Sequence, residues 1–196
     1  QGGLIGPLTR AFGEHRLFQL GAMGFALAMV GTVVAGEQGS YYGAMAALAL
    51  AQPAVDDYKK VALVEPLQRS LKTKKAKLED ALKGYAVAAD YGVADASTAA
   101  TFHTAALYQD FGQAMLKSQR PKGLKKLELE QYNVLLEEQA FPFEEKAITL
   151  HEINAKRSAQ GVYDEWVSKS FAALRTLKPG RYARAERVEG VIDAIR

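Results

Sequence analysis

The sequence contains no cysteine, so the chain can form neither disulfide bonds nor thiolate metal sites. This absence leaves open whether the protein works in an oxidising or a reducing compartment. Prolines number only 6 among 196 residues, and no segment alternates apolar and polar residues as a strand does. The net charge of +3 is too small to indicate nucleic acid as a partner by itself. The start at Gln1 shows no signal-peptide pattern, and we expect that a targeting segment is not present in this chain.

The residues that are abundant favour helix. Hydrophobic residues make up 48% of the chain, and alanine, leucine, lysine and glutamate dominate the composition. A chain of 196 residues can bury a substantial core in one domain. Tight turns separate the apolar segments, so sequential helices should be antiparallel neighbours. We therefore predict an all-α protein of seven or eight helices.

Charged residues are scarce in the N-terminal part, residues 1–64. Only four precede Asp56, namely Arg10, Glu14, Arg16 and Glu37. Residues 17–35 form an apolar run of membrane-spanning length. No basic cluster flanks this run, which favours a buried helix over a membrane span, although the span stays an alternative. Glycines at 36 and 39 predict a turn, and a second helix should cover residues 41–63 and be kinked or interrupted at Pro53.

A motif of regularly spaced apolar residues recurs in the rest of the chain. Val167, Phe171 and Leu174 lie on one helix face, with Pro179 just past its end. Residues 81, 85 and 88 repeat the spacing without the proline. Such a motif is typical of helix pairs that stack on copies of themselves. We expect first helices near residues 42–60, 97–117 and 143–160, with a break at residues 141–143 between helices 124–138 and 143–160.

The last two-thirds of the chain resembles a tetratricopeptide-repeat protein. The string from Lys83 to Ala88, and the string from Trp166 to Leu174 followed by Pro179, read as second helices of such units. The resemblance implies a right-handed superhelix of antiparallel helix pairs, a TPR-like α-solenoid. Two features depart from the family. The usual tryptophan of the first helix is absent, and the units exceed the family's length of about 34 residues.

A narrower resemblance is to the C-terminal part of large bacterial cell-envelope repeat proteins. It rests on residues 118–124, 129–132, 135–147 and 161–167. It implies a location in the bacterial cell envelope, in the periplasm. In these terms the chain is one helical-repeat domain over residues 1–196. Its parts are the apolar residues 1–64, degenerate repeat units at 65–180 and a basic tail at 181–196 with a short helix at 188–195.

No residue pattern indicates catalysis, a cofactor or a metal ion. His15, His103 and His151 are far apart in sequence, and Ala155 removes the spacing of a zinc-protease motif after His151. Metal sites need several converging ligands. The adjacent acids Glu144 and Glu145 suit the first turn of the helix expected at 143–160, where they would favour its dipole. We therefore expect neither a catalytic residue nor a bound cofactor, and we predict that the protein is not an enzyme.

A basic cluster marks the loop expected at residues 118–123. It consists of Lys117, Arg120, Lys122, Lys125 and Lys126, with no acid among its ten residues. A solvated loop is the ordinary explanation. The sharper hypothesis is a site for an acidic partner, in which Arg120 would chelate a carboxylate. No aromatic residues interleave the cluster, which disfavours nucleic acid.

Helical spacing predicts that a stripe of aromatic residues belongs to the core: Tyr85, Phe102, Tyr108, Phe111, Tyr132 and Phe171. In a solenoid, some of these tyrosines would instead face the concave surface. Together these features predict a non-catalytic scaffold or adaptor. Its partner would be a protein, through an acidic or extended segment or within a membrane-associated complex, and neither nucleic acid nor a small-molecule substrate. Three alternatives remain: a membrane-anchored subunit with a span at residues 17–35, an enzyme on a helical scaffold, and an obligate oligomer.

Overall fold

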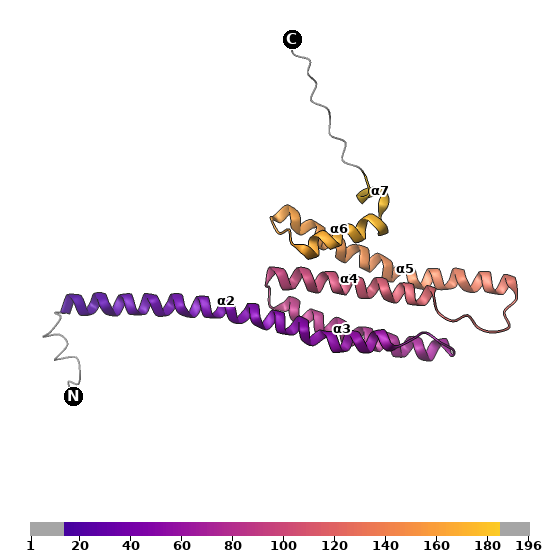
Figure 1. The fold of residues 1–196 in the computed structure, drawn as a ribbon, viewed down its shortest axis with the longest axis horizontal. Helices are drawn as coiled ribbons and strands as arrows, with labels where there is room; N and C mark the ends of the chain where they lie inside the picture. Colours follow the sequence, from indigo (N-terminus) through magenta and orange to yellow (C-terminus); the bar gives the residue numbers. More distant parts are fainter. Residues whose placement is uncertain (1–13, 185–196) are drawn as a thin grey trace, which may run out of the picture. The chain divides into compact units, whose positions relative to one another are not determined.

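A computed structural model describes the backbone of residues 14–184 and the side chains of residues 36–184. Within these ranges helices are the only regular secondary structure, without strands, which confirms the all-α prediction (Figure 1). The predicted number of seven or eight helices is wrong, because six α-helices are present in this part of the chain. They are α2 (Glu14–Lys60), α3 (Leu67–Asp90), α4 (Ala94–Leu116), α5 (Lys126–Arg157), α6 (Glu165–Leu177) and α7 (Pro179–Tyr182), and a single 3-10 turn, η1 (Ser158–Gln160), follows α5.

The turn predicted at residues 36–39 does not exist. Helix α2 continues through Gly36 and Gly39, and also through Pro53. A glycine inside a helix costs only about 1 kcal/mol, so it ends a helix only where the backbone must turn left-handed. Neither of these two glycines has a positive φ. The predicted helix pair of the N-terminal part is therefore one helix.

The break predicted at residues 141–143 is also wrong, because α5 runs through Pro142. A proline inside a helix costs about 3 kcal/mol, which packing on both sides of it can outweigh. Ala140 and Ala147 are buried on either side of it, and the Phe143 ring lies 4.6 Å from the ring of Phe111 in α4. Consequently the acids at 144 and 145 lie inside α5 and not in a first turn.

Other helix ends follow from single residues, and the end predicted at Pro179 is confirmed. Gly92 and Gly161 have positive φ angles of 69° and 83°, and each follows the end of a helical segment. Asp164 caps α6, because its carboxylate accepts a hydrogen bond from the backbone N of Val167 at 2.8 Å. Pro179 ends the continuation of α6 and begins α7.

The chain divides into two units, residues 1–43 and 44–196. In the first unit the described side chains begin at residue 36, and Tyr41 and Tyr42 are exposed there. Among the residues searched, no helix is long and apolar enough to cross a membrane. The side chains of the suggested span at residues 17–35, and the helix expected at 188–195, lie outside the described residues.

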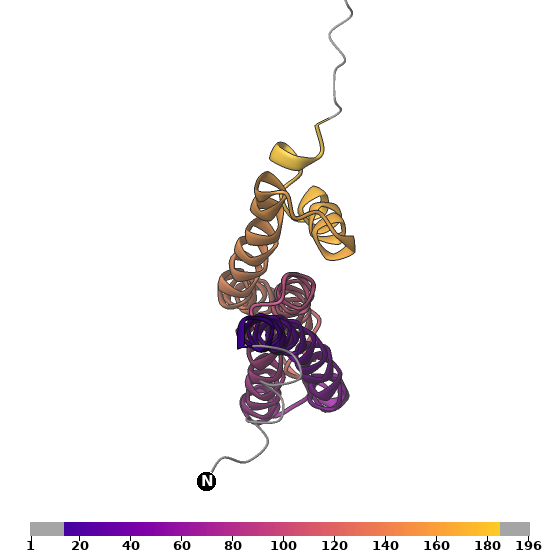
Figure 2. The same cartoon turned by 90° about the vertical axis from the view of Figure 1, so that its left-hand side faces the viewer.

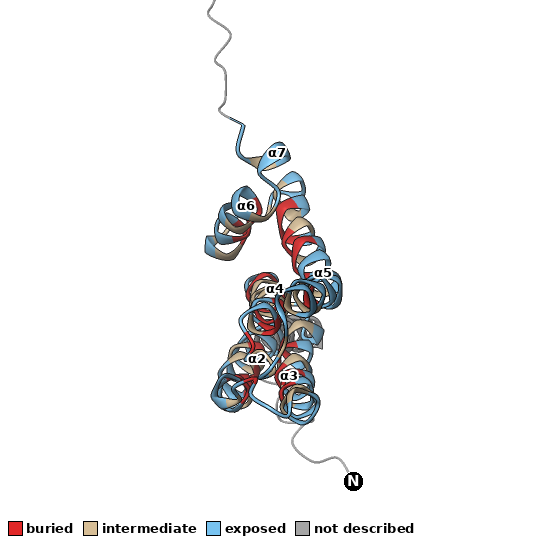
Figure 3. Cartoon of the chain, turned by 90° about the vertical axis from the view of Figure 1, so that its right-hand side faces the viewer, coloured by how far each residue is buried: buried red, intermediate tan, exposed pale blue. Residues whose placement is uncertain are grey.

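The core of the second unit lies where residues 44–60 of α2, α3, α4 and α5 face one another. Figure 2 shows these helices side by side, and Figure 3 shows buried residues on the faces that they turn to each other. Tyr58 and Phe111 are its largest fully buried side chains. A smaller cluster of Ile148, Ala155 and Leu174 joins the C-terminal part of α5 to α6.

A candidate binding groove

A groove with two adjoining hollows lies in the second unit. The larger hollow has a volume of about 360 Å³ and the smaller about 220 Å³. Both are lined by Tyr85 of α3 and His103 of α4, so they meet over these two rings. Trp166 of α6 closes the larger hollow, and Lys59 of α2 lines the smaller one. The other lining residues are Met45, Leu48, Ala49, Gln52, Asp95 and Ala99 in the larger hollow and Val55, Ala106, Leu107 and Asp110 in the smaller.

Three aromatic rings lie together at the groove: Tyr85 and His103 line both hollows, and Trp166 lines the larger one. The rings of Tyr85 and His103 are stacked, with centroids 5.2 Å apart and planes 11° apart. The ring of Trp166 lies 4.7 Å from that of His103. The helices α2 and α3 approach closely beside Tyr85, because a Cβ added at Gly84 would lie only 2.8 Å from the Cβ of Ala51. Only glycine at this position lets the two helices pack so closely beside Tyr85.

The surroundings of His103 favour the neutral form of its ring. Burial lowers the pKa of its ring below the usual value, and the positive charges of Lys169 and Lys59 lower this pKa further. Among the residues that the structure describes, His103 makes no hydrogen bond. A neutral imidazole carries one donor and one acceptor nitrogen. The groove therefore offers one hydrogen-bond donor and one acceptor, the two ring nitrogens of His103, beside apolar ring faces. This arrangement suits the binding of a ligand that has both polar and apolar groups.

A buried polar network supports the Trp166 side of the groove. Asn154 of α5 donates from Nδ2 to the Thr98 carbonyl and to Ser170 Oγ, both at 3.0 Å. The Thr98 hydroxyl in turn donates to the carboxylate of Asp164, the cap of α6. His151 Nδ1 lies 3.2 Å from Ser170 Oγ. These contacts join α4, α5 and α6, and they fix the helix that carries Trp166.

A second polar cluster lies beside the smaller hollow of the groove. The hydroxyl of Tyr58 donates to Asp110 Oδ2 at 2.7 Å, which turns this carboxylate toward α2. Lys74 places Nζ 4.1 Å from the centre of the Tyr58 ring and donates to the carbonyls of Tyr58 and Val61 at 3.3 and 2.9 Å. Burial lowers the pKa of the Lys74 ammonium, while the charge of Asp110 opposes this shift. The smaller hollow thus has an acid and, through Lys59, a base at its edge.

The predicted basic loop lies between α4 and α5, and its cations differ in their surroundings. Arg120 donates to the carbonyls of Leu116 and Ser118 at 2.7 and 2.6 Å and to Asn133 Oδ1 at 2.7 Å. Most of its donors therefore hold the end of α4 and the loop. Lys117, Lys122, Lys125 and Lys126 are exposed. The backbone N of Lys122 donates to Glu65 Oε1 at 3.2 Å, so an acid that is distant in sequence lies beside the cluster.

Within the described part of the chain, no group of three or more histidine and acidic residues could hold a metal ion. His15 lies outside that part, whereas His103 and His151 belong to the groove and to the network behind it. The chain matches no family model, no curated protein and no solved structure at a significant level.

The groove could not be found from the sequence. His103 and Trp166 are far apart in the chain, and no motif links them. The aromatic stripe was predicted to be core, which holds for Tyr85 and Phe111, the buried members of the set. The spacing of residues 81, 85 and 88 indicates only that Tyr85 lies on the buried face of α3.

Proposed function

We propose that this protein is a non-catalytic binding module that holds an extended segment of a protein partner over Tyr85, His103 and Trp166. The observation that carries the proposal is the meeting of two hollows at His103, whose ring nitrogens make no hydrogen bond within the described residues. Alternate side chains of an extended segment are about 6–7 Å apart, so two of them can enter neighbouring hollows. A main-chain amide between them can then bond to the imidazole.

The proposal includes the architecture and location that the sequence resemblance implies. The helix pairs would be degenerate TPR-like units of a right-handed superhelix, and the module would belong to a bacterial cell-envelope assembly in the periplasm. The support for this part is the sequence resemblance alone, which rests on residues 83–88, 118–124, 129–132, 135–147 and 161–174 and on Pro179. A membrane-anchored subunit with a span at residues 17–35 would carry the same groove.

The sole tryptophan of the chain provides a direct test. Random peptides displayed on phage are selected on the full chain, and synthetic copies are titrated while Trp166 emission is recorded. We expect binding to shift the emission, because a ligand in the larger hollow removes water from the indole. Affinity should fall about tenfold or more in His103→Ala, a loss typical of an anchoring contact.

The matched control is Tyr163→Ala, which removes a ring that is 66% exposed and lines neither hollow. This variant should bind as the unaltered protein does. Peptides that bind His103→Ala with unchanged affinity, or selection that enriches no peptide, would refute the proposed groove.

The basic loop gives the proposal a second element. We propose that Lys122, Lys125 and Lys126 contact acidic residues of the partner, because their side chains are exposed. Reversal of these three lysines to glutamate should weaken partner capture, and capture by the unaltered chain should weaken with salt. Arg120 was also predicted to bind a partner, but it is left unchanged in this variant because it holds the loop. Capture that is insensitive to both changes would remove the loop from the site.

A further inference from the structure

One face of α5 carries an apolar residue at every seventh position along its whole length. These residues are Leu127, Val134, Phe141, Ile148 and Ala155. Seven residues of an α-helix fall about 20° short of two full turns, so neighbouring members of this set lie on the same side of the helix, and the line through all five winds by about 80° around the helix axis. We call this line the α5 stripe.

The chain itself covers the C-terminal half of the α5 stripe. Ile148 and Ala155 are each only 8% exposed, because they pack against Leu174 of α6. Phe171, Leu177 and Tyr182 pack against the same cluster. The covering segment, residues 171–182, thus supplies the apolar side chains that bury this half.

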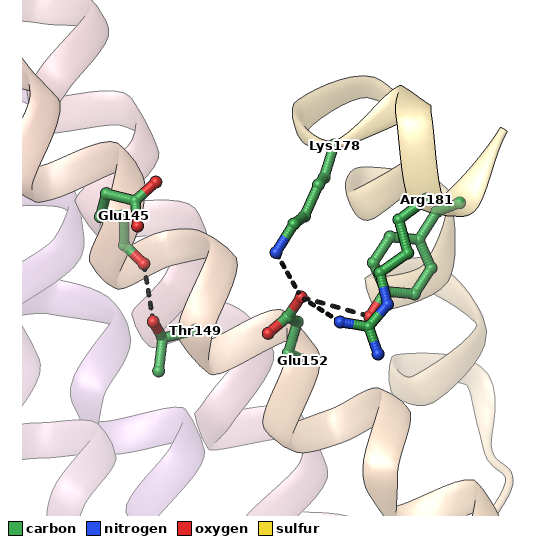
Figure 4. Close-up of polar contacts among 6 residues, drawn as sticks. Glu145, Thr149, Glu152, Lys178 and Arg181 are labelled. Atoms are coloured by element: carbon green, nitrogen blue, oxygen red, sulfur yellow. Dashed lines mark hydrogen bonds and ion pairs between the residues drawn. The ribbon is translucent and has the colours of Figure 1, made fainter.

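The covering segment also supplies cations. Glu152 lies on the same face of α5, and its Oε1 accepts a hydrogen bond from Lys178 Nζ at 3.0 Å (Figure 4). Arg181 Nη1 lies 3.6 Å from the same oxygen, and the hydroxyl of Tyr182 donates to it at 3.3 Å. The hydrogen bond from Lys178 is the main reason that the pKa of Glu152 lies below its usual value. The covering segment therefore combines apolar side chains, which contact the C-terminal half of the α5 stripe, with basic side chains, which pair with Glu152.

The N-terminal half of the α5 stripe has the same chemistry, and its side chains are exposed in the part of the chain that the structure describes. Leu127, Val134 and Phe141 are 66%, 54% and 61% exposed. Residues 127–145 contain six glutamates and no basic residue. Five of these acids flank the stripe by helical spacing, and all five are exposed: Glu130, Glu137, Glu138, Glu144 and Glu145. Within residues 36–184, none of the five forms an ion pair.

We propose that the open half of the α5 stripe is a second binding surface, which takes an amphipathic helix of a partner protein with lysine or arginine flanking its apolar face. Such a helix would lie on Leu127, Val134 and Phe141 as residues 171–182 lie on the covered half. Its cations would meet the flanking glutamates as Lys178 and Arg181 meet Glu152. This surface is separate from the groove at His103 and does not depend on the function proposed for it.

Two other segments that could cover the open half of the α5 stripe fit its chemistry less well. The remaining C-terminal residues, 185–196, contain three acids and two bases, which suits an acidic surface poorly. In a second copy of the chain, the segment with the required chemistry, residues 171–182, is already seated on its own α5. A basic helix from another protein meets neither objection.

The test uses a fluorescein-labelled helical peptide made only of leucine and lysine, with leucines three and four residues apart. The full chain should raise its fluorescence anisotropy in a saturable, salt-sensitive manner. The counterpart made of leucine and glutamate should not bind. Binding of both peptides alike would show contact without charge recognition and would overturn the proposal.

Matched variants locate the binding. Val134→Ser should weaken the leucine–lysine peptide about tenfold, whereas Val87→Ser on α3, where the valine is similarly exposed at 53%, should not. Glu137→Gln with Glu138→Gln should also weaken it, in contrast to Glu79→Gln with Asp80→Asn on α3. Circular dichroism confirms that each variant retains its helix content. Equal effects of the α5 and α3 changes would overturn the assignment to the stripe.

Two measurements distinguish the other occupants. If sedimentation shows a dimer that Val134→Ser dissociates, the stripe belongs to a second copy. If removal of residues 185–196 strengthens peptide binding about tenfold, the stripe belongs to the C-terminal residues. Either result would overturn the proposal of a basic partner helix, while peptide binding at the His103 groove would be unaffected.

Discussion

At the scale of single residues, His151 is a buried ionisable group whose charge state is linked to stability. Its side chain is 1% exposed, and burial lowers the pKa of its ring to about 4. Because the unfolded chain has the ordinary pKa near 6.5, the unfolded state binds the proton first as the pH falls. The free energy of unfolding should therefore decrease between pH 6.5 and pH 4, and it should be insensitive to this group above pH 6.5.

The expected loss from His151 alone is about 2–3 kcal/mol across that window. Urea unfolding at a series of pH values measures it. His151→Asn keeps a polar group near Ser170 without a titrating ring, so this variant should show a shallower slope. The lowered pKa of His103 affects both proteins equally. Identical slopes in the two proteins would show that His151 is not held neutral.

Gly84 gives a second prediction at this scale. Gly84→Ala should lower the free energy of unfolding by about 1–3 kcal/mol, because the new methyl group would lie 2.8 Å from the Cβ of Ala51. Gly39→Ala is the control, since no atom lies within 4 Å of the added methyl group. It should be neutral or stabilise the helix by about 1 kcal/mol. Chemical denaturation compares the two, and equal effects would contradict the close contact.

Single residues were predictable where one residue performs a local task. Asp164 as a helix cap, and Gly92 and Gly161 at left-handed turns, follow from side-chain length and from the missing Cβ. The partners of His103 and Arg120 were not predictable, because they come from distant parts of the chain or from loop geometry. Tyr85 shows both cases: its burial follows from helical spacing, whereas its stacking on His103 does not.

At the scale of elements, the loop of residues 117–125 depends on one side chain. Arg120→Ala should lower the free energy of unfolding by about 1–3 kcal/mol, because it leaves the carbonyls of Leu116 and Ser118 without their charged donor. Lys122→Ala should change it by less than about 0.5 kcal/mol, since that side chain is exposed. Thermal or urea unfolding decides between them. An Arg120 variant as stable as Lys122→Ala would return Arg120 to the candidates for partner binding.

Helix existence was predictable for these elements, but helix boundaries inside long segments were not. Glycine at 36 and 39 and proline at 53 and 142 were expected to divide helices, yet α2 and α5 continue through them. The cost of such a residue is local and modest. In α5, it is outweighed by buried contacts on both sides of Pro142, which the sequence does not reveal.

At the scale of the whole molecule, both buried clusters lie within residues 44–196. We therefore predict that a chain truncated to residues 44–196 remains helical and unfolds cooperatively, because it keeps every described core contact. Circular dichroism during urea unfolding measures this. A gradual, non-cooperative loss of signal would show that residues 1–43 are needed for the core.

The helical class, the buried face of α3 and the cap at Asp164 follow from the sequence alone, because they depend on residues that are neighbours in the chain. The continuity of α2 and α5, the contact of His103 with Tyr85 and Trp166, and the cover over half of the α5 stripe depend on the folded structure. These outcomes depend on the free energy of packing between distant segments. Local propensity contributes about 1–3 kcal/mol at a glycine or proline, and burial of several side chains exceeds it.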